Sequence, residues 1–161
     1  MAQLGPSYKE PMSYSPNFRG IVGKGSSRQT QTGYTNTTAS LITAASPVYR
    51  SASGIAPLDV TTEASVEAFV GLCAADLPTT ASGLVVSDGR CENIPLSLGF
   101  SVGDAIWAGP TPGSLTNVKP DSSAPGWAAG YFVVFIGVVV ANEFNPSNQD
   151  IQLFKQLVGQ L

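Results

Sequence analysis

Histidine is absent from the 161 residues of this chain. Histidine is the commonest general base and a frequent metal ligand near neutral pH, so its absence excludes Ser/His and Cys/His catalytic arrangements within the chain. The acidic residues that follow Arg50 are single and dispersed, and no spacing among them favours a paired carboxylate site. We therefore expect that the chain is not an enzyme and has no catalytic residue, cofactor or metal.

Cysteine is scarce as well, with only Cys73 and Cys91. Two cysteines do not form the dense disulfide framework of small secreted domains, and their sequence context shows no CxxC or Cys/His spacing of a metal site. Both lie in segments that we expect to be strands, and we favour two free, buried thiols. A disulfide bridge between them stays open.

Charged residues make up 12% of the chain, about half the share that is usual in soluble proteins. Hydrophobic residues make up 43%, which is enough for a core, and 12 prolines and 17 glycines interrupt the sequence too often for long helices. The longest apolar run, residues 131–141, is about half the length of a membrane-spanning helix. We expect a soluble, mostly β protein with no membrane partner.

The first 40 residues differ from the rest in composition and charge. They are rich in Ser, Thr, Gly, Gln, Asn, Tyr and Pro and show no sustained apolar period, so they cannot bury enough surface to fold alone. The net charge is +4 through Arg50 and −7 after it, which gives −3 for the whole chain. We expect residues 1–40 to be an extended basic N-terminal arm and residues 41–161 to be a β-rich body domain.

Spaced aromatic and cationic side chains in the arm suit binding to a partner protein, because an extended segment can add a strand to a partner's sheet. The residues that we expect to bind are Tyr8, Lys9, Tyr14, Phe18, Arg19, Lys24, Arg28 and Tyr34. The cations are too few for a polybasic tract, so nucleic acid is not expected as a partner. A disordered leader without consequence is the alternative.

The body consists of brief apolar runs bounded by turn residues, which is typical of short strands. The expected strands are residues 47–49, 68–74, 84–86, 90–94, 102–108, 115–118, 131–140 and 150–158. The run 131–140 has no polar alternation and favours a strand buried on both faces. Residues 150–158 also fit a helix face, although we favour a strand. Asp88-Gly89 predicts a tight hairpin between the third and fourth of these runs.

Two parts of the body have similar sequences. In each, an aliphatic–aromatic pair precedes a glycine turn, a short strand, a loop and an aromatic–aliphatic–Gly–aliphatic strand. The first part contains Val48-Tyr49, Gly54-Ile55 and residues 69–72, and the second contains Ile106-Trp107, Gly113-Ser114-Leu115 and residues 135–138. A duplicated β-unit would produce this pattern, with the two units packed as a small β-barrel or sandwich. Chance similarity between short strands is the alternative.

A series of short motifs runs through residues 41–140. It comprises Val48-Tyr49, Gly54-Ile55, Val70-Gly71-Leu72, residues 83–89, Gly103-Asp104-Ala105-Ile106-Trp107, Gly113-Ser114-Leu115-Thr116 and Ile136-Gly137-Val138. In content and order this series resembles the small head decoration (capsid cement) proteins of tailed bacteriophages. The resemblance leaves the arm uncovered.

The resemblance implies a structural virion protein that binds the outside of a phage capsid in many copies, often as a homotrimer. It also implies that the extended arm pairs with subunits of the major capsid protein. The protein would be made in the host cytoplasm and located on the capsid surface of the virion.

Two alternatives remain. Similar β-bodies serve in tail, baseplate or fibre components, which contact other virion proteins or host surface glycans, and Trp107, Trp127 or Tyr131 would then be stacking platforms. Of these, Trp107 falls in an expected strand and is more simply core, whereas Trp127 lies in a Gly/Pro loop and is expected to be exposed. A small hydrolase that uses carboxylates is the other alternative, which the lack of histidine disfavours.

Overall fold

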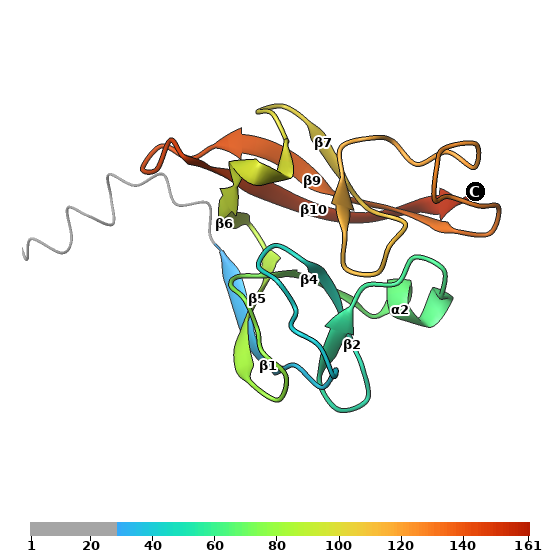
Figure 1. The fold of residues 1–161 in the computed structure, drawn as a ribbon, viewed down its shortest axis with the longest axis horizontal. Helices are drawn as coiled ribbons and strands as arrows, with labels where there is room; N and C mark the ends of the chain where they lie inside the picture. The colour runs from blue at the N-terminus through green and yellow to red at the C-terminus, as the bar shows by residue number, and fades with distance from the viewer. Residues whose placement is uncertain (1–28) are drawn as a thin grey trace, which may run out of the picture.

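The computed structural model describes residues 29–161, which form two five-stranded antiparallel sheets. The second sheet lies above the first in Figure 1. The first sheet has the order β1-β5-β4-β2-β3. Its strands are β1 Thr30–Thr35, β2 Pro47–Arg50, β3 Ile55–Pro57, β4 Phe69–Cys73 and β5 Ser82–Asp88. The prediction of a mostly β protein is confirmed.

The second sheet has the order β6-β10-β9-β7-β8. Its strands are β6 Arg90–Pro95, β7 Ala105–Ala108, β8 Leu115–Thr116, β9 Phe132–Ala141 and β10 Asn148–Gln160. A helix, α2 (Glu63–Glu67), and a 3₁₀ turn, η1 (Leu96–Leu98), are the helical elements of the described part. No helix within residues 29–161 is long and apolar enough to cross a membrane.

The two sheets repeat one topology. Each strand of the second sheet takes the place of the strand of the first sheet whose number is lower by five, so that β6 corresponds to β1 and β10 to β5. Tyr49 pairs with Phe69 in the first sheet, and Trp107 pairs with Phe135 at the same place in the second, each directly after a register shift. The sequence similarity between the two parts of the body thus corresponds to one strand arrangement used twice.

The match extends to the turns that precede β2 and β7. Ala45 and Gly103 both have a positive φ, of 64° and 96°, and their N–H groups donate to the carbonyls of Cys73 and Val139, each at 2.9 Å. Such a conformation is easy for glycine and costs an alanine about 1–2 kcal/mol. Retention of the conformation at Ala45 indicates that the surrounding hydrogen bonds fix this turn in both repeats.

The predicted hairpin at Asp88-Gly89 is wrong. Strand β5 pairs with β1 and β4, whereas β6 pairs with β10. Gly89 has φ 83°, as an Asp-Gly turn requires, but the turn carries the chain from the first sheet into the second. Strands β1 and β4 already pair with the two edges of β5, so β5 has no free edge with which β6 could pair.

Two core clusters hold the sheets. The larger lies between them and includes Leu72, Val86, Cys91, Ile94, Ile106, Ile136, Val139, Ile151 and Leu153. The smaller contains Ile42, Val48, Ile55, Cys73, Leu77 and Val85 and lies on the other face of the first sheet. There an isolated bridge between Ile42 and Leu77 joins two loops over the sheet. A second bridge, between Asn36 and Ile55, joins the end of β1 to the other edge strand, β3, so that the sheet forms a half-barrel. Each face of the first sheet therefore packs against one of the two clusters.

Part of the segment assigned to the arm belongs to the body. Residues 30–35 form β1, which pairs along its length with β5. Asn36 follows and is fully buried, with its side-chain amide donating to the carbonyls of Ser40 and Leu77. The physical reason is that β5 offers an open edge, which this Thr- and Gln-rich stretch pairs with through its backbone although it has few apolar side chains.

At two glycines that occupy equivalent places in the repeats, the backbone of a neighbouring strand comes very close. Substitution of these glycines tests whether the two repeats are built alike. A Cβ at Gly71 would fall on the carbonyl oxygen of Val86, and a Cβ at Gly137 on that of Gln152. We expect Gly71→Ala and Gly137→Ala each to lower the free energy of unfolding by about 2 kcal/mol or more, because the backbones of adjacent strands must separate. Urea denaturation followed by circular dichroism measures the change.

Gly33→Ala in β1 is the matched control, since a Cβ there meets nothing within 4 Å. It should change stability by less than about 0.5 kcal/mol. Equal losses for all three variants would contradict the close-approach argument.

Candidate functional site

Four aspartates of the described part accept hydrogen bonds in turns and loops. Asp76 accepts a hydrogen bond from the N–H of Ala44, and Asp59 accepts one from that of Thr61. The backbone N–H of Ser101 and the amide of Asn117 lower the pKa of Asp104. Hydrogen bonds from the hydroxyl and N–H of Ser123 lower the pKa of Asp121. Within residues 29–161 no group of His, Cys, Asp and Glu is placed to hold a metal ion.

Asp150 is the exception among these acids, because its side chain is buried. It accepts hydrogen bonds from the backbone N–H of Asn93 at 3.1 Å and from the amide of Asn142 at 2.9 Å, and forms an ion pair with Arg90 at 3.4 Å. These partners belong to β6 and to the turn between β9 and β10. The carboxylate of Asp150 therefore links β6 to the turn between β9 and β10.

Both cysteines are free and buried in strands, as the sequence predicts. Burial raises the pKa of Cys73 to about 11. Burial, with the negative charge of Asp150 next in importance, raises that of Cys91 to about 12. Neither thiol is activated as a nucleophile in the folded protein.

A row of aromatic rings crosses the outer face of the second sheet, the face turned away from the first sheet. Trp107 of β7 packs on Phe135 of β9 with ring centroids 5.1 Å apart. Phe135 in turn stacks on Phe154 of β10 at 6.1 Å and 10°. Phe154 is 60% exposed, and Trp107 and Phe135 are half-buried. We call Trp107, Phe135 and Phe154 the aromatic row.

The equivalent face of the first sheet packs against the core between the sheets. There Tyr49 and Phe69, which occupy the places of Trp107 and Phe135, pack against the larger core cluster under the second sheet. Neither Trp107 nor Phe135 belongs to either core cluster. All four side chains are half-buried, and the two repeats differ in that those of the first pack against the core between the sheets.

A correction concerns the two tryptophans. Trp107, expected in the core, lies on the open face, and Trp127, expected to be exposed, is buried in the larger core cluster. The loop between β8 and β9 folds Trp127 inward, where its ring meets Tyr131 edge-on at 6.1 Å. Sequence could not distinguish the faces of β7, because the strand is apolar on both sides. Trp127 is therefore no exposed stacking platform.

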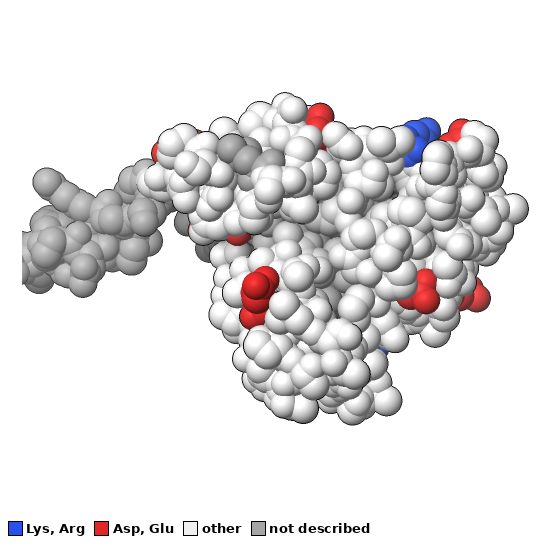
Figure 2. Space-filling model, viewed as in Figure 1, with Lys and Arg blue, Asp and Glu red and all other residues white. Residues whose placement is uncertain are grey.

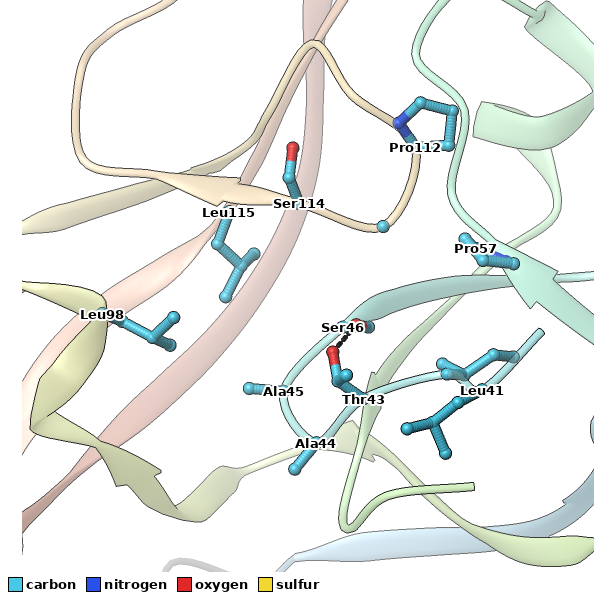
Figure 3. A pocket seen from close by; sticks show the side chains of 12 residues that line it. Leu41, Thr43, Ala44, Ala45, Ser46, Pro57, Leu98, Pro112, Ser114 and Leu115 are labelled. Atoms are coloured by element: carbon cyan, nitrogen blue, oxygen red, sulfur yellow. Dashed lines mark hydrogen bonds between the residues drawn. The ribbon is translucent and has the colours of Figure 1, made fainter. Parts of the chain in front are cut away.

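A second open feature is a cleft of about 380 Å³ between the two repeats (Figure 3). One wall is the loop of residues 41–46, and the other is formed by η1 and the β7–β8 turn. Leu41 and Leu98 are 52% and 45% exposed at its rim. The turn is fixed to the first repeat, because the N–H of Gly113 donates to the carbonyl of Leu58 at 2.9 Å. The cleft is shallow, and it is lined by small and aliphatic residues.

Of the arm residues predicted to bind a partner, one lies in the described part. Tyr34 is in β1 and is half-buried against the smaller core cluster, so its ring contributes to the body. Tyr8, Lys9, Tyr14, Phe18, Arg19, Lys24 and Arg28 lie outside the described residues. The arm joins the body at Gln29, directly before the edge strand β1.

Figure 2 shows that the drawn face of the body is largely uncharged, with few basic side chains. Of the eight Lys and Arg residues, four stand in residues 1–28. Half of the cations therefore fall in the first 28 residues, and the other four are spread over residues 29–161.

Comparisons with protein-family models, with curated proteins and with solved structures find no match for this chain.

Thiol labelling tests the burial of the cysteines. At pH 8 a thiol with a pKa of about 11 is ionised in only about one molecule in a thousand, and the sheets also block access. We expect neither Cys73 nor Cys91 to react with iodoacetamide in the native protein and both to react in guanidinium chloride. Intact mass spectrometry counts the adducts, and a native protein that gains two adducts rapidly would refute the assignment.

Proposed function

We propose that this chain is a structural virion protein that binds the outside of a phage capsid and stabilises it. The observation that carries the proposal is the division of the chain into a basic arm and a body built from one β-unit used twice. The aspartates that fix turns and the two buried thiols have structural roles in the body. The resemblance to phage decoration proteins supplies the identity of the partner, the major capsid protein.

The arm is the element that we assign to capsid binding. It leaves the body at β1, which is an edge strand of the first sheet. An extended chain can pair its backbone with an exposed strand of a capsid subunit, while its aromatic residues fill pockets beside that strand. Each such contact can be weak, because a shell presents many equivalent sites and one arm reinforces the capsid at each.

The proposal includes duplication as the origin of the body and self-association of the bodies on the capsid surface. The repeated strand order and the repeated glycine contacts support the duplication. The resemblance supports self-association, with trimers as the expected form. The protein is then located on the virion surface after synthesis in the host cytoplasm.

Deletion of residues 1–28 tests the role of the arm. The deletion must end before β1, because removal of β1 and Asn36 would open the first sheet and confound the result. We expect the truncated protein to keep the circular dichroism spectrum and unfolding transition of the full chain but to be lost from capsids. Copies per particle are counted by quantitative gel analysis of purified capsids. Unchanged occupancy by a folded truncated protein would refute the proposal.

Charge in the arm generates a separate prediction. Replacing Lys9, Arg19, Lys24 and Arg28 with Gln should weaken capsid binding and flatten its salt dependence, because the arm is expected to meet an acidic surface. Raising salt from about 0.1 M to about 1 M shortens the Debye length from about 10 Å to about 3 Å and should release the wild-type protein. The control is Arg50→Gln, an exposed cation of the body. An equal effect of that control would place the electrostatic contact on the body.

The half-exposed aromatic row supports a second candidate, a tail, baseplate or fibre component that contacts other virion proteins or glycans. Electron cryo-microscopy of particles that carry the labelled protein distinguishes the two, because one predicts density over the head and the other over the tail.

A further inference from the structure

We propose that Gly89 is a hinge through which this chain associates with other copies of itself, by exchange of the second repeat between them. Residues 29–88 form the first repeat and residues 90–161 the second. In the exchanged form, the first sheet of one copy packs on the second sheet of its neighbour. The inference rests on the self-association in the proposed function and names the way in which the copies are joined.

The connection between the repeats is a single residue. Strand β5 ends at Asp88 and β6 begins at Arg90, so that Gly89 alone lies between them. All strands of the first sheet precede Gly89 and all strands of the second sheet follow it (Figure 1). Both cysteines are free, so no disulfide holds the repeats together. The repeats can therefore separate without the loss of a strand pair in either sheet.

The surface that a second copy would cover is already seen covered in the single chain. In the larger core cluster, Leu72 and Val86 of the first repeat pack with Ile136 and Ile151 of the second. When the second repeat of one copy moves away, it exposes a surface that fits the second repeat of another. Exchange then buries the same apolar surface between two chains that one chain buries within itself, which makes it a low-cost route to association.

Polar contacts across the interface are retained on exchange as well. The N–H of Gly113 donates to the carbonyl of Leu58 at 2.9 Å, and the N–H of Phe132 donates to that of Val60 at 2.8 Å. In both bonds the second repeat supplies the donor and the first repeat the acceptor. A neighbouring copy therefore offers the same partners, and no buried polar group is left unpaired.

The backbone of Gly89 has the freedom that exchange requires. Its φ of 83° turns the chain from the first sheet into the second. With an extended φ, β5 would continue into β6 as one strand over residues 82–95. Glycine adopts both conformations at little cost. A connection of one residue also leaves little slack, and short hinges of this kind favour exchange.

Hydrogen bonds locate the movement on one side of the hinge. The carbonyl of Gly89 accepts from the N–H of Leu153 at 2.8 Å and from the side-chain amide of Gln152 at 3.1 Å. Both donors lie in β10, so this carbonyl stays with the second repeat when the repeats separate. The rotation is then about the N–Cα bond of Gly89, the bond that φ describes.

Exchange has a consequence for the proposed function. Each chain keeps its own arm, so an exchanged oligomer carries several arms on one assembled body. Such an oligomer engages several sites of a shell at once, which strengthens binding without any new contact.

Alanine at the hinge tests the proposal in the full-length chain. Alanine is disfavoured at φ 83° but not in an extended strand, so Gly89→Ala should favour the exchanged form. We expect the wild-type chain to form oligomers over the micromolar range, and the variant to have an association constant higher by about tenfold or more. Sedimentation velocity of samples refolded from denaturant measures the fractions.

Gly103→Ala is the matched control. Gly103 has φ 96°, and a Cβ there meets nothing within 4 Å. The backbone cost of this alanine lies within the second repeat, where it is the same in the closed and exchanged forms, so association should not change. A wild-type chain that stays at 16.6 kDa throughout, or a Gly89→Ala variant that associates no more than Gly103→Ala, would overturn the inference.

A disulfide across the interface distinguishes exchange from contact through another surface, and it does not depend on the folding of the hinge variant. Val60→Cys with Phe132→Cys places two thiols on backbones that a 2.8 Å hydrogen bond joins. In exchanged oligomers these thiols meet between chains, so oxidised oligomers should run as linked chains on a denaturing gel without reductant. Monomers of the same variant, in which the bond forms within one chain, are the control.

Oxidised oligomers that run as single chains would contradict exchange. None of these results bears on capsid binding by the arm, which the deletion of residues 1–28 tests separately.

Discussion

The packing of the two sheets against each other organises the molecule. Leu72 and Val86 from one side meet Ile136 and Ile151 from the other in the larger core cluster, and burial of this apolar surface is the main favourable term in the stability of such a small body. The loops of the first repeat pack on one side of the first sheet, and the second repeat packs on the other.

This stacking makes the two repeats unequal although their topology is the same. Equivalent positions carry a tyrosine and a tryptophan at Tyr49 and Trp107, and phenylalanines at Phe69 and Phe135. The aromatic character is thus kept where the face is open. The neighbouring position diverges from Val86 to Gln152, as expected where a sheet meets water at the border of a contact. The pattern fits a face that is apolar at its centre and polar at its edge.

Much of the fold could be predicted from the sequence. Short apolar runs located β4, β7 and β9, the alternation of Ile151 and Leu153 favoured strand β10, and the recurring aromatic–aliphatic–Gly–aliphatic pattern identified the repeat. The turn at Gly89 could not be placed, because local turn chemistry is the same in a hairpin and in a crossing between sheets. The strand β1 was missed because backbone pairing holds it, and its side chains carry little apolar signal.

The candidate surface was harder to predict than the fold. Trp107 was expected in the core because a strand that is apolar on both sides does not reveal which side has a cover. Phe154 depends on a bulge, and the positive φ of Lys155 leaves no mark in the sequence, since lysine is not a residue that favours it. The available signal was the excess of apolar residues in β9, which exceeds what one buried face needs.

The separation of charge between arm and body suits a protein that both coats a surface and associates with itself. A basic arm on an acidic body would tend to bind neighbouring bodies as well as the capsid, and salt would weaken both contacts equally. Apolar contacts between bodies would not compete in this way, because their attraction comes from the burial of apolar surface. In the proposed function, arm binding and body association can then be strengthened or weakened independently, so that weak contacts of two kinds add around the capsid.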